Sequence, residues 1–348
     1  MPDRHALLIE LLNRAVDQRS VFGTAFSVGW HDQTYSAAAG DLALHQPFFI
    51  ASVTKLFVTA LVLQLQGENR LALDDPITRW LDANTLDGLH RLRGQDHSTA
   101  ITVTHLLAHT SGLPDYFSDS VPGSQSWQKD LMRTRTDRAW RFEDALAHSK
   151  HLQPRFVPGT RGRAHYSDTN FQLLGRIIEC IEEQPLATSI ARRITQPLEL
   201  TNTWLYTDPQ DQRPHPIHLG RKPLAIPQAM ASFQADGGMV STAPELLRFV
   251  RAFFSGHWFA PSVLAGLQVW RRIFYPFESG IGMQRFRLPW WLDPLGRTPE
   301  LIGYIGLSGT VAFHVPALNI SVAGTINQAA DPGKALRLTL RLLQAFSR

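Results

Sequence analysis

Ser52 and Lys55 are the two residues of this 348-residue sequence whose types and spacing are best suited to covalent chemistry. They are three positions apart, so on a helix both side chains project from one face, one turn apart. A lysine in apolar surroundings loses hydration, which lowers its pKa and leaves a neutral amine that can accept the proton of a serine hydroxyl. Lys55 is the only formally charged side chain between Leu42 and Gly67, which favours this catalytic interpretation. The same spacing also fits a serine that caps the helix and a lysine that extends to solvent.

Tyr166 and Asp168 form a second candidate pair, at the start of a predicted helix. A structural interpretation makes Ser167 or Asp168 the cap of that helix and places Tyr166 in the core. A functional interpretation places the Tyr166 hydroxyl beside Ser52 as a second proton carrier, with Asp168 orienting Lys55. The residues alone leave both interpretations open.

Strand patterns occupy both ends of the chain and helical patterns fill the middle, which predicts an α+β fold. The expected strands are 24–30, 34–39, 48–50, 280–286, 301–305, 311–315 and 320–326. The expected helices are 4–19, 52–66, 103–109, 142–148, 169–183, 186–194, 244–254 and 332–346. The economical architecture is an antiparallel sheet flanked by N- and C-terminal helices, with an inserted α-helical domain.

The length of the chain suits two domains, or one large domain with an insertion. We therefore predict a discontinuous sheet domain made of residues 1–70 and 266–348. Residues 71–265 form the inserted, mainly helical domain, and the active site lies between the two.

Composition excludes several classes of protein. With 44% apolar and 18% charged residues the chain can bury a full core, so global disorder is excluded. The net charge is only +4, and no run of five or more Lys or Arg occurs, which argues against nucleic acid as the main partner. The single cysteine, Cys180, cannot form an internal disulfide or a multi-cysteine zinc site, and we expect it to be a small buried apolar residue. His105 and His109 have the spacing of a metal-binding pair, but no glutamate follows His105, so we expect no metal and no organic cofactor.

The location of the protein is predicted from two further observations. The first twenty residues alternate charged and apolar side chains, and no secretory signal is visible in them. The apolar stretch 48–65 has Lys55 near its middle, where a charge costs ~2.5–3.5 kcal/mol in a bilayer. We therefore expect a buried helix, no membrane span and a cytoplasmic protein. The sequence does not reveal the oligomeric state.

Five motifs, in the same order, resemble those of the serine β-lactamase and penicillin-binding-protein-like superfamily. The resemblance is closest to its class C branch and to the related family VIII carboxylesterases and D-aminopeptidases. The matching segments run over nearly the whole chain; they are 50–55 (IASVTK), 101–114 (ITVTHLLAHTSGLP), 166–175 (YSDTNFQLLG), 235–242 (ADGGMVST) and 322–328 (VAGTINQ).

The resemblance implies an acyl-enzyme mechanism. Ser52 matches the nucleophile of this superfamily and Lys55 its general base. Tyr166 matches a tyrosine that passes a proton to the leaving group. Asp168 stands where the superfamily usually has asparagine; a carboxylate there can accept a hydrogen bond from Lys55, but it also favours the charged amine and so opposes its action as a base.

A third superfamily element normally contains Lys or His, a hydroxyl residue and glycine, and its best match is Tyr304-Ile305-Gly306. By the same resemblance, the backbone N–H groups of Leu307 and Ser52 form the oxyanion hole. The missing cation normally helps to hold a substrate carboxylate. The substitution therefore favours a neutral acyl donor, with an apolar group near Ile305 and with Tyr304 and Gly306 also contacting the substrate.

The predicted function is that of a serine hydrolase that acts on a small ester or amide through an acyl-enzyme on Ser52. Its partner is a small-molecule acyl substrate. One alternative is an acyltransferase or amide-forming enzyme of a biosynthetic pathway, which shares the acyl-enzyme. An alternative of another class is a β-lactamase-fold binding protein that has lost its activity.

An aromatic and basic cluster lies before the third element. It contains Phe286, Trp290 and Trp291, with Arg285 and Arg287 beside them. The cluster fits either the lining of a substrate entrance or an aromatic loop packed on the surface.

Overall fold

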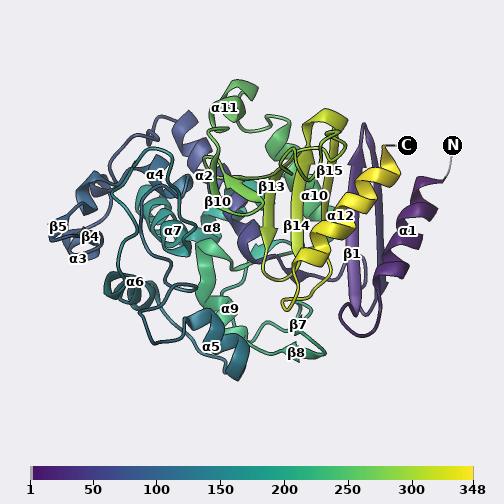
Figure 1. Cartoon of the computed structure of the whole chain (residues 1–348), viewed down its shortest axis with the longest axis horizontal. Helices are drawn as coiled ribbons and strands as arrows, with labels where there is room; N and C mark the ends of the chain where they lie inside the picture. Colours follow the sequence, from purple (N-terminus) through teal and green to yellow (C-terminus); the bar gives the residue numbers. More distant parts are fainter. Residues whose placement is uncertain (1–2, 348) are drawn as a thin grey trace.

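A computed structural model describes residues 3–347, and its centre is an eight-stranded antiparallel sheet (Figure 1). The strand order is β10-β11-β12-β13-β14-β15-β1-β2. The bounds are β1 (Gly23–Trp30), β2 (Gln33–Gly40), β10 (Arg271–Phe274), β11 (Phe277–Ser279), β12 (Gln284–Phe286), β13 (Leu301–Gly306), β14 (Thr310–Val315) and β15 (Ile320–Thr325). Because β15 pairs with β1, the two ends of the chain complete one sheet.

Helices cover both faces of this sheet, and alternation along the strands separates two apolar cores. Helices α1 (Arg4–Ala15) and α12 (Gly333–Phe346) cover one face, where Phe313 of β14 points into their core. Helices α2 (Thr54–Gly67) and α10 (Ala243–Phe254) belong to the core on the other face, which contains Ala312. This architecture confirms the predicted α+β fold with terminal helices.

The remaining helices lie mainly beside the second face (Figure 1). They are α3 (Ala83–Leu86), α4 (Val103–Leu107), α5 (Trp127–Thr134), α6 (Phe142–His151), α7 (Asp168–Glu182), α8 (Leu186–Ile190), α9 (Pro227–Phe233) and α11 (Pro261–Gly266). Short strands form three small sheets: β3 (Phe48–Phe49), β9 (Met239–Ser241) and β6 (Trp204–Leu205) in one, β4 (Arg91–Leu92) with β5 (Gln95–Asp96), and β7 (Ile217–Leu219) with β8 (Lys222–Leu224). The division into two domains stays a prediction.

Three predicted elements differ from the structure for local reasons. The first helix ends at Ala15 rather than residue 19, because the Asp17 carboxylate accepts the N–H groups of the turn that follows. The strand expected over 280–286 is interrupted at Gly282, whose φ of +74° turns the chain between β11 and β12. The helix expected over 186–194 widens into a π-helical turn, η4 (Ala191–Thr195).

Helix α2 is buried along nearly its whole surface, as its apolar sequence predicts. Eleven of its 14 residues are buried, including Lys55. Helix α2 therefore lies in the protein core, which fixes the residues at its N-terminus. Within residues 3–347, no helix is long and apolar enough to cross a bilayer.

The stacked pair Phe57 and Phe249 joins α2 to α10, with ring centroids 3.6 Å apart and both side chains fully buried. We expect Phe249→Ala to lower the free energy of unfolding by about 3–5 kcal/mol, because the cavity left behind cannot close fully. Urea denaturation followed by circular dichroism measures the effect. Val157→Ala, at an exposed apolar position, serves as the control. A loss below 1 kcal/mol for Phe249→Ala would show that this contact does not anchor α2.

Candidate active site

Ser52 lies in a single 3-10 turn, η1 (Ala51–Val53), directly before α2. The preceding residue, Ala51, has a left-handed φ of +47°, which is unusual for a residue with a Cβ and marks local backbone strain. Strand β13 passes close behind this turn: a Cβ on Gly306 would lie 2.4 Å from the carbonyl oxygen of Ile50. Glycine at position 306 is therefore needed for β13 to approach the serine.

Lys55 lies in the first turn of α2 and has no exposed surface. Its Nζ is 3.4 Å from Ser52 Oγ and 2.7 Å from Asp168 Oδ1, and it donates a 2.5 Å hydrogen bond to the carbonyl oxygen of Asp236. Burial lowers the pKa of Lys55, but the negative charge of Asp168, with a smaller contribution from Asp236, more than offsets it, so the pKa is raised. The expectation of a lowered pKa is thus wrong, because the carboxylate supplies what hydration would have supplied.

Tyr166 lies just before α7, and its side chain contacts Ser52. Its hydroxyl donates a 2.8 Å hydrogen bond to Ser52 Oγ, and burial raises its pKa well above the usual value. The structure therefore brings Ser52, Lys55, Tyr166 and Asp168 together around one hydroxyl oxygen.

His109 holds Tyr166 from behind, with the two ring centroids 4.6 Å apart. Its Nδ1 accepts the backbone N–H of Ser167 at 3.1 Å and lies 3.2 Å from Asn170 Nδ2. With Nδ1 an acceptor, the ring proton is on Nε2, which faces the Tyr304 hydroxyl at 3.2 Å. Burial lowers the pKa of His109 well below its usual value, which keeps the ring neutral.

Tyr304 is 1% exposed, and it does not line the cavity described below. Its side chain instead lies behind the site, against His109. A direct contact between Tyr304 and substrate, expected from the sequence, does not fit this position. The following residues Ile305, Gly306 and Leu307 do line the cavity.

Asp236 and Tyr116 are neighbours of the site that the sequence analysis did not single out. The Tyr116 hydroxyl and Gln172 Nε2 each donate a 2.9 Å hydrogen bond to Asp236 Oδ2. Burial, together with the charge of Asp168, raises the pKa of Asp236 well above its usual value. Asp236 lies within the segment 235–242, which resembles the superfamily, but nothing in its local pattern indicates a contact with Lys55, 181 positions away.

A cavity of about 580 Å³ opens over Ser52. Its apolar walls come mainly from α5, α9 and the β10–β11 hairpin: Leu131, Met132, Met230, Phe233, Ile273, Phe274 and Phe277. Three aspartates, Asp115, Asp168 and Asp236, also line it. None of the described residues that line this cavity is a lysine or an arginine.

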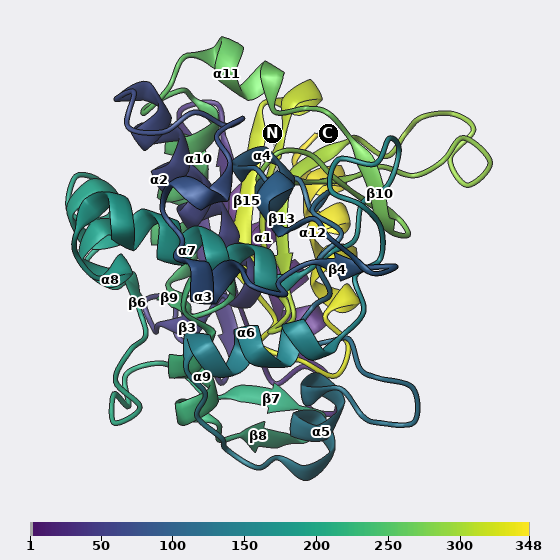
Figure 2. The same ribbon diagram turned by 90° about the vertical axis from the view of Figure 1, so that its left-hand side faces the viewer.

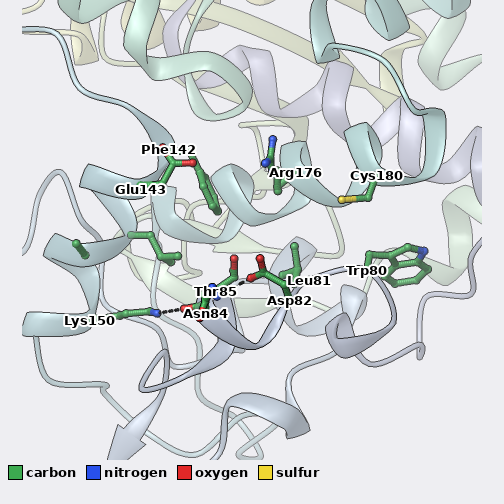
Figure 3. A pocket seen from close by; sticks show the side chains of 12 residues that line it. Trp80, Leu81, Asp82, Asn84, Thr85, Phe142, Glu143, Lys150, Arg176 and Cys180 are labelled. Atoms are coloured by element: carbon green, nitrogen blue, oxygen red, sulfur yellow. Dashed lines mark hydrogen bonds between the residues drawn. The ribbon is translucent and has the colours of Figure 1, made fainter.

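A second cavity, of about 420 Å³, lies among α3, α6 and α7 and contains none of the predicted site residues (Figure 3). Arg176 and Cys180 of α7 border it, with Trp80, and Lys150 donates a hydrogen bond to the carbonyl oxygen of Asn84 across it. Cys180 is exposed, so the expectation of a buried cysteine is wrong. It occupies the outer face of α7, while the inner face carries the neighbouring apolar residues.

The two histidines with metal-pair spacing have separate structural contacts. His105 Nδ1 accepts the Thr102 N–H in a capping box at the start of α4, and His109 packs on Tyr166. Within residues 3–347, no cluster of three or more His, Cys, Asp or Glu side chains has the arrangement of a metal site.

The sheet, its flanking helices and the serine at the start of a buried helix define the β-lactamase/transpeptidase-like fold. The profile of the Beta-lactamase family matches residues 8–346, so the chain belongs to that family. Esterase EstB of Burkholderia gladioli is 26% identical over 98% of this chain and 94% of its own length. The D-stereospecific amidohydrolase of Streptomyces sp. has a TM-score of 0.79 and 27% identity, covering 97% of this chain and 98% of its own.

Protein Rv1367c of Mycobacterium tuberculosis is more similar over a shorter region. It is 35% identical over 229 residues, which are 59% of this chain and 53% of that protein. The chain thus spans about half the length of this relative. Together with the esterase and the amidohydrolase, the family assignment makes this chain a member of a β-lactamase-fold hydrolase family.

Asp115 provides a test of the electrostatics of the cavity. Burial, assisted by the charge of Asp168, raises its pKa to about 7, whereas an unfolded aspartate titrates near 3.8. Between about pH 4 and pH 7 the folded protein therefore keeps a proton on Asp115 that the unfolded chain releases. Because the unfolded chain binds fewer protons, the free energy of unfolding falls as pH rises through this range. Relative to wild type, Asp115→Asn should become more stable over this range, by at most about 4 kcal/mol.

Urea denaturation at several pH values measures that difference, with the exposed Asp32→Asn as the control. Asparagine retains an oxygen for the Phe117 N–H that Asp115 accepts. A stability difference that stays constant with pH would show that Asp115 is ionised in the folded protein.

Proposed function

We propose that this protein is a serine hydrolase that forms an acyl-enzyme on Ser52 and acts on small esters or amides. The observation that carries the proposal is the contact of Ser52 Oγ with two proton carriers, Tyr166 at 2.8 Å and Lys55 at 3.4 Å, beneath an apolar cavity. Both distances suit proton transfer as the serine attacks. Membership of a hydrolase family with esterase and amidohydrolase relatives supports the same reaction class.

In the proposed first step, Ser52 Oγ bonds to the carbonyl carbon of the substrate and its proton passes to Lys55 in its neutral form. The carbonyl oxygen becomes an oxyanion, which the backbone N–H groups of Ser52 and Leu307 stabilise. Both residues line the cavity, at the N-terminus of α2 and the end of β13. The bond to the leaving group then breaks, Tyr166 donates a proton to that group, and the ammonium of Lys55 returns the serine proton to Tyr166. Water then attacks the carbonyl carbon of the acyl-enzyme, the ester bond to Ser52 Oγ breaks, one water proton returns to Ser52 Oγ, and the carboxylic acid leaves.

The ion pair with Asp168 sets the pH at which this step runs. Since Asp168 favours the charged form of Lys55, only a small fraction of the amine is neutral at pH 7. In the proposed enzyme, few Lys55 amines can therefore accept the serine proton at neutral pH, and the rate of acylation rises with pH.

The cavity supports a substrate class without a carboxylate next to the reacting bond. Its lining contains three aspartates, Asp115, Asp168 and Asp236, and none of the described lining residues is a lysine or an arginine that could hold an anionic group. Desolvating a substrate carboxylate beside them is unfavourable. Ile305 and the aromatic wall instead suit an apolar acyl group, as in neutral esters and amides.

Covalent labelling tests the nucleophile. Wild-type protein incubated with a fluorophosphonate should gain one adduct by intact-mass measurement, and Ser52→Ala should gain none. Lys55→Met, which keeps the apolar stem but removes the amine, should be labelled at least 100-fold more slowly. Ser308→Ala is a matched control, because Ser308 lines the same cavity without contacting Lys55 or Tyr166 in the described structure. An unlabelled wild type would favour the inactive binding protein, and equal labelling of Ser52→Ala would exclude Ser52 as the nucleophile.

Replacing Asp168 by asparagine tests the role of the ion pair. Without the carboxylate the pKa of Lys55 falls, so the rise of the acylation rate with pH should move to lower pH, by at least one pH unit. The measurement is the pH dependence of the acylation rate with an activated ester such as p-nitrophenyl butyrate. An unchanged profile would assign the titrating base to another group.

A further inference from the structure

The loop between β12 and β13 exposes large apolar side chains that neither the fold nor the proposed reaction uses. In this aromatic loop (residues 287–300), Trp290 is 77% exposed, Trp291 60% and Leu295 70%. Figure 2 shows the loop projecting from the body of the molecule on the side of β10. The aromatic cluster predicted from the sequence is thus divided, because Phe286 is buried while the two tryptophans face solvent.

The β10–β11 hairpin continues this apolar surface to the cavity. Tyr275 at its tip is 56% exposed and Phe274 44%. Phe274 also lines the cavity, and its ring centroid is 6.0 Å from that of Tyr166. An exposed apolar surface therefore includes a residue at the edge of the candidate active site.

Exposed arginines accompany the exposed apolar side chains. Arg272, Arg287 and Arg297 are exposed, and within residues 3–347 none of them forms an ion pair with a carboxylate. Asp293 accepts the N–H groups at the loop's end and its charge interacts with that of Arg297, while Glu300 pairs with Arg285. Residues 271–300 carry five arginines and three acidic residues, so this surface combines exposed tryptophans with a net positive charge.

We propose that the aromatic loop, with the tip of the β10–β11 hairpin, binds an anionic lipid surface. Tryptophan and leucine side chains on a projecting loop can enter the boundary between headgroups and acyl chains, while arginines contact lipid phosphates. In a symmetric dimer through this loop, the arginines of one copy would lie beside those of the other, and like charges repel. Charge therefore favours a lipid surface over a second copy of the chain.

This binding would orient the molecule without any change in the reaction at Ser52. Since Phe274 belongs to both the exposed surface and the cavity wall, the cavity would open close to the lipid. The inference is independent of the proposed function, because a protein without activity would bind in the same way.

Co-sedimentation with vesicles tests the proposal. The full chain should pellet with vesicles made of equal parts phosphatidylglycerol and phosphatidylcholine, and only weakly with phosphatidylcholine alone. Trp290→Ser/Trp291→Ser should weaken binding at least tenfold, because the inserted apolar area is lost. Arg287→Gln/Arg297→Gln should weaken it about 25-fold, since each arginine near an anionic surface contributes about fivefold. High salt should also weaken binding of the wild-type protein, because it screens the attraction between the arginines and the anionic lipids.

Two control variants distinguish binding by this surface from non-specific binding through other exposed apolar or basic side chains. Ile9→Ser removes an exposed apolar side chain from α1, which packs on β2 at the opposite edge of the sheet from β10. Arg19→Gln/Arg341→Gln removes two exposed arginines elsewhere. Both should bind vesicles like wild type, and circular dichroism should show all variants folded. Equal binding by the tryptophan variant, absence of binding by wild type, or a dimer in sedimentation velocity that the tryptophan variant abolishes would each overturn the proposal.

Discussion

The ammonium group of Lys55 is fully withdrawn from water, and much of the surrounding structure supplies what water would have supplied. Asp168 on α7 provides the opposite charge, and the carbonyl oxygen of Asp236 accepts a further hydrogen bond. A buried charge without such partners would be strongly destabilising. The need to satisfy one cation therefore links the start of α2, the start of α7 and the turn at residue 236. Ser52 and Tyr166 are held at the same junction because they belong to the same segments.

The environment behind Tyr166 is built from neutral groups. His109 is uncharged, its tautomer is set by the Ser167 N–H, and it faces the Tyr304 hydroxyl. The position that carries Lys or His in the resembling superfamily thus contributes to a buried polar network here. Such a network holds the tyrosine ring in place without adding a second positive charge beside Lys55. Tyr304 itself does not line the cavity, whose wall is mainly apolar with three aspartates and other polar residues such as Gln128 and His165.

Sequence patterns predicted the parts of the molecule in which local and global preferences agree. The apolar run of α2 and the alternation in β1, β14 and β15 indicated their structures, because the apolar residues in each pattern are the ones that the structure buries. The prediction that Ser52, Lys55, Tyr166 and Asp168 lie together came from the order of the motifs that resemble the superfamily. The position of Tyr304 did not follow, because which face of β13 meets the cavity depends on the partners of that strand. The contact of Asp236 with Lys55 and the raised pKa of the amine likewise depend on tertiary packing. The exposure of Cys180 depends on which face of α7 meets α2.

The pairing of β1 with β15 has a consequence for how the protein is made. Ala25 is in register with Thr325, so one edge of β1 stays unpaired during synthesis until β15, 300 residues further along the chain, has been made. Until then, both β1 and the apolar face of α10 lack the strand that covers them. Contacts between such distant segments form slowly and leave strand edges open in the meantime. The nascent chain must therefore remain protected from aggregation at least until β15 has left the ribosome.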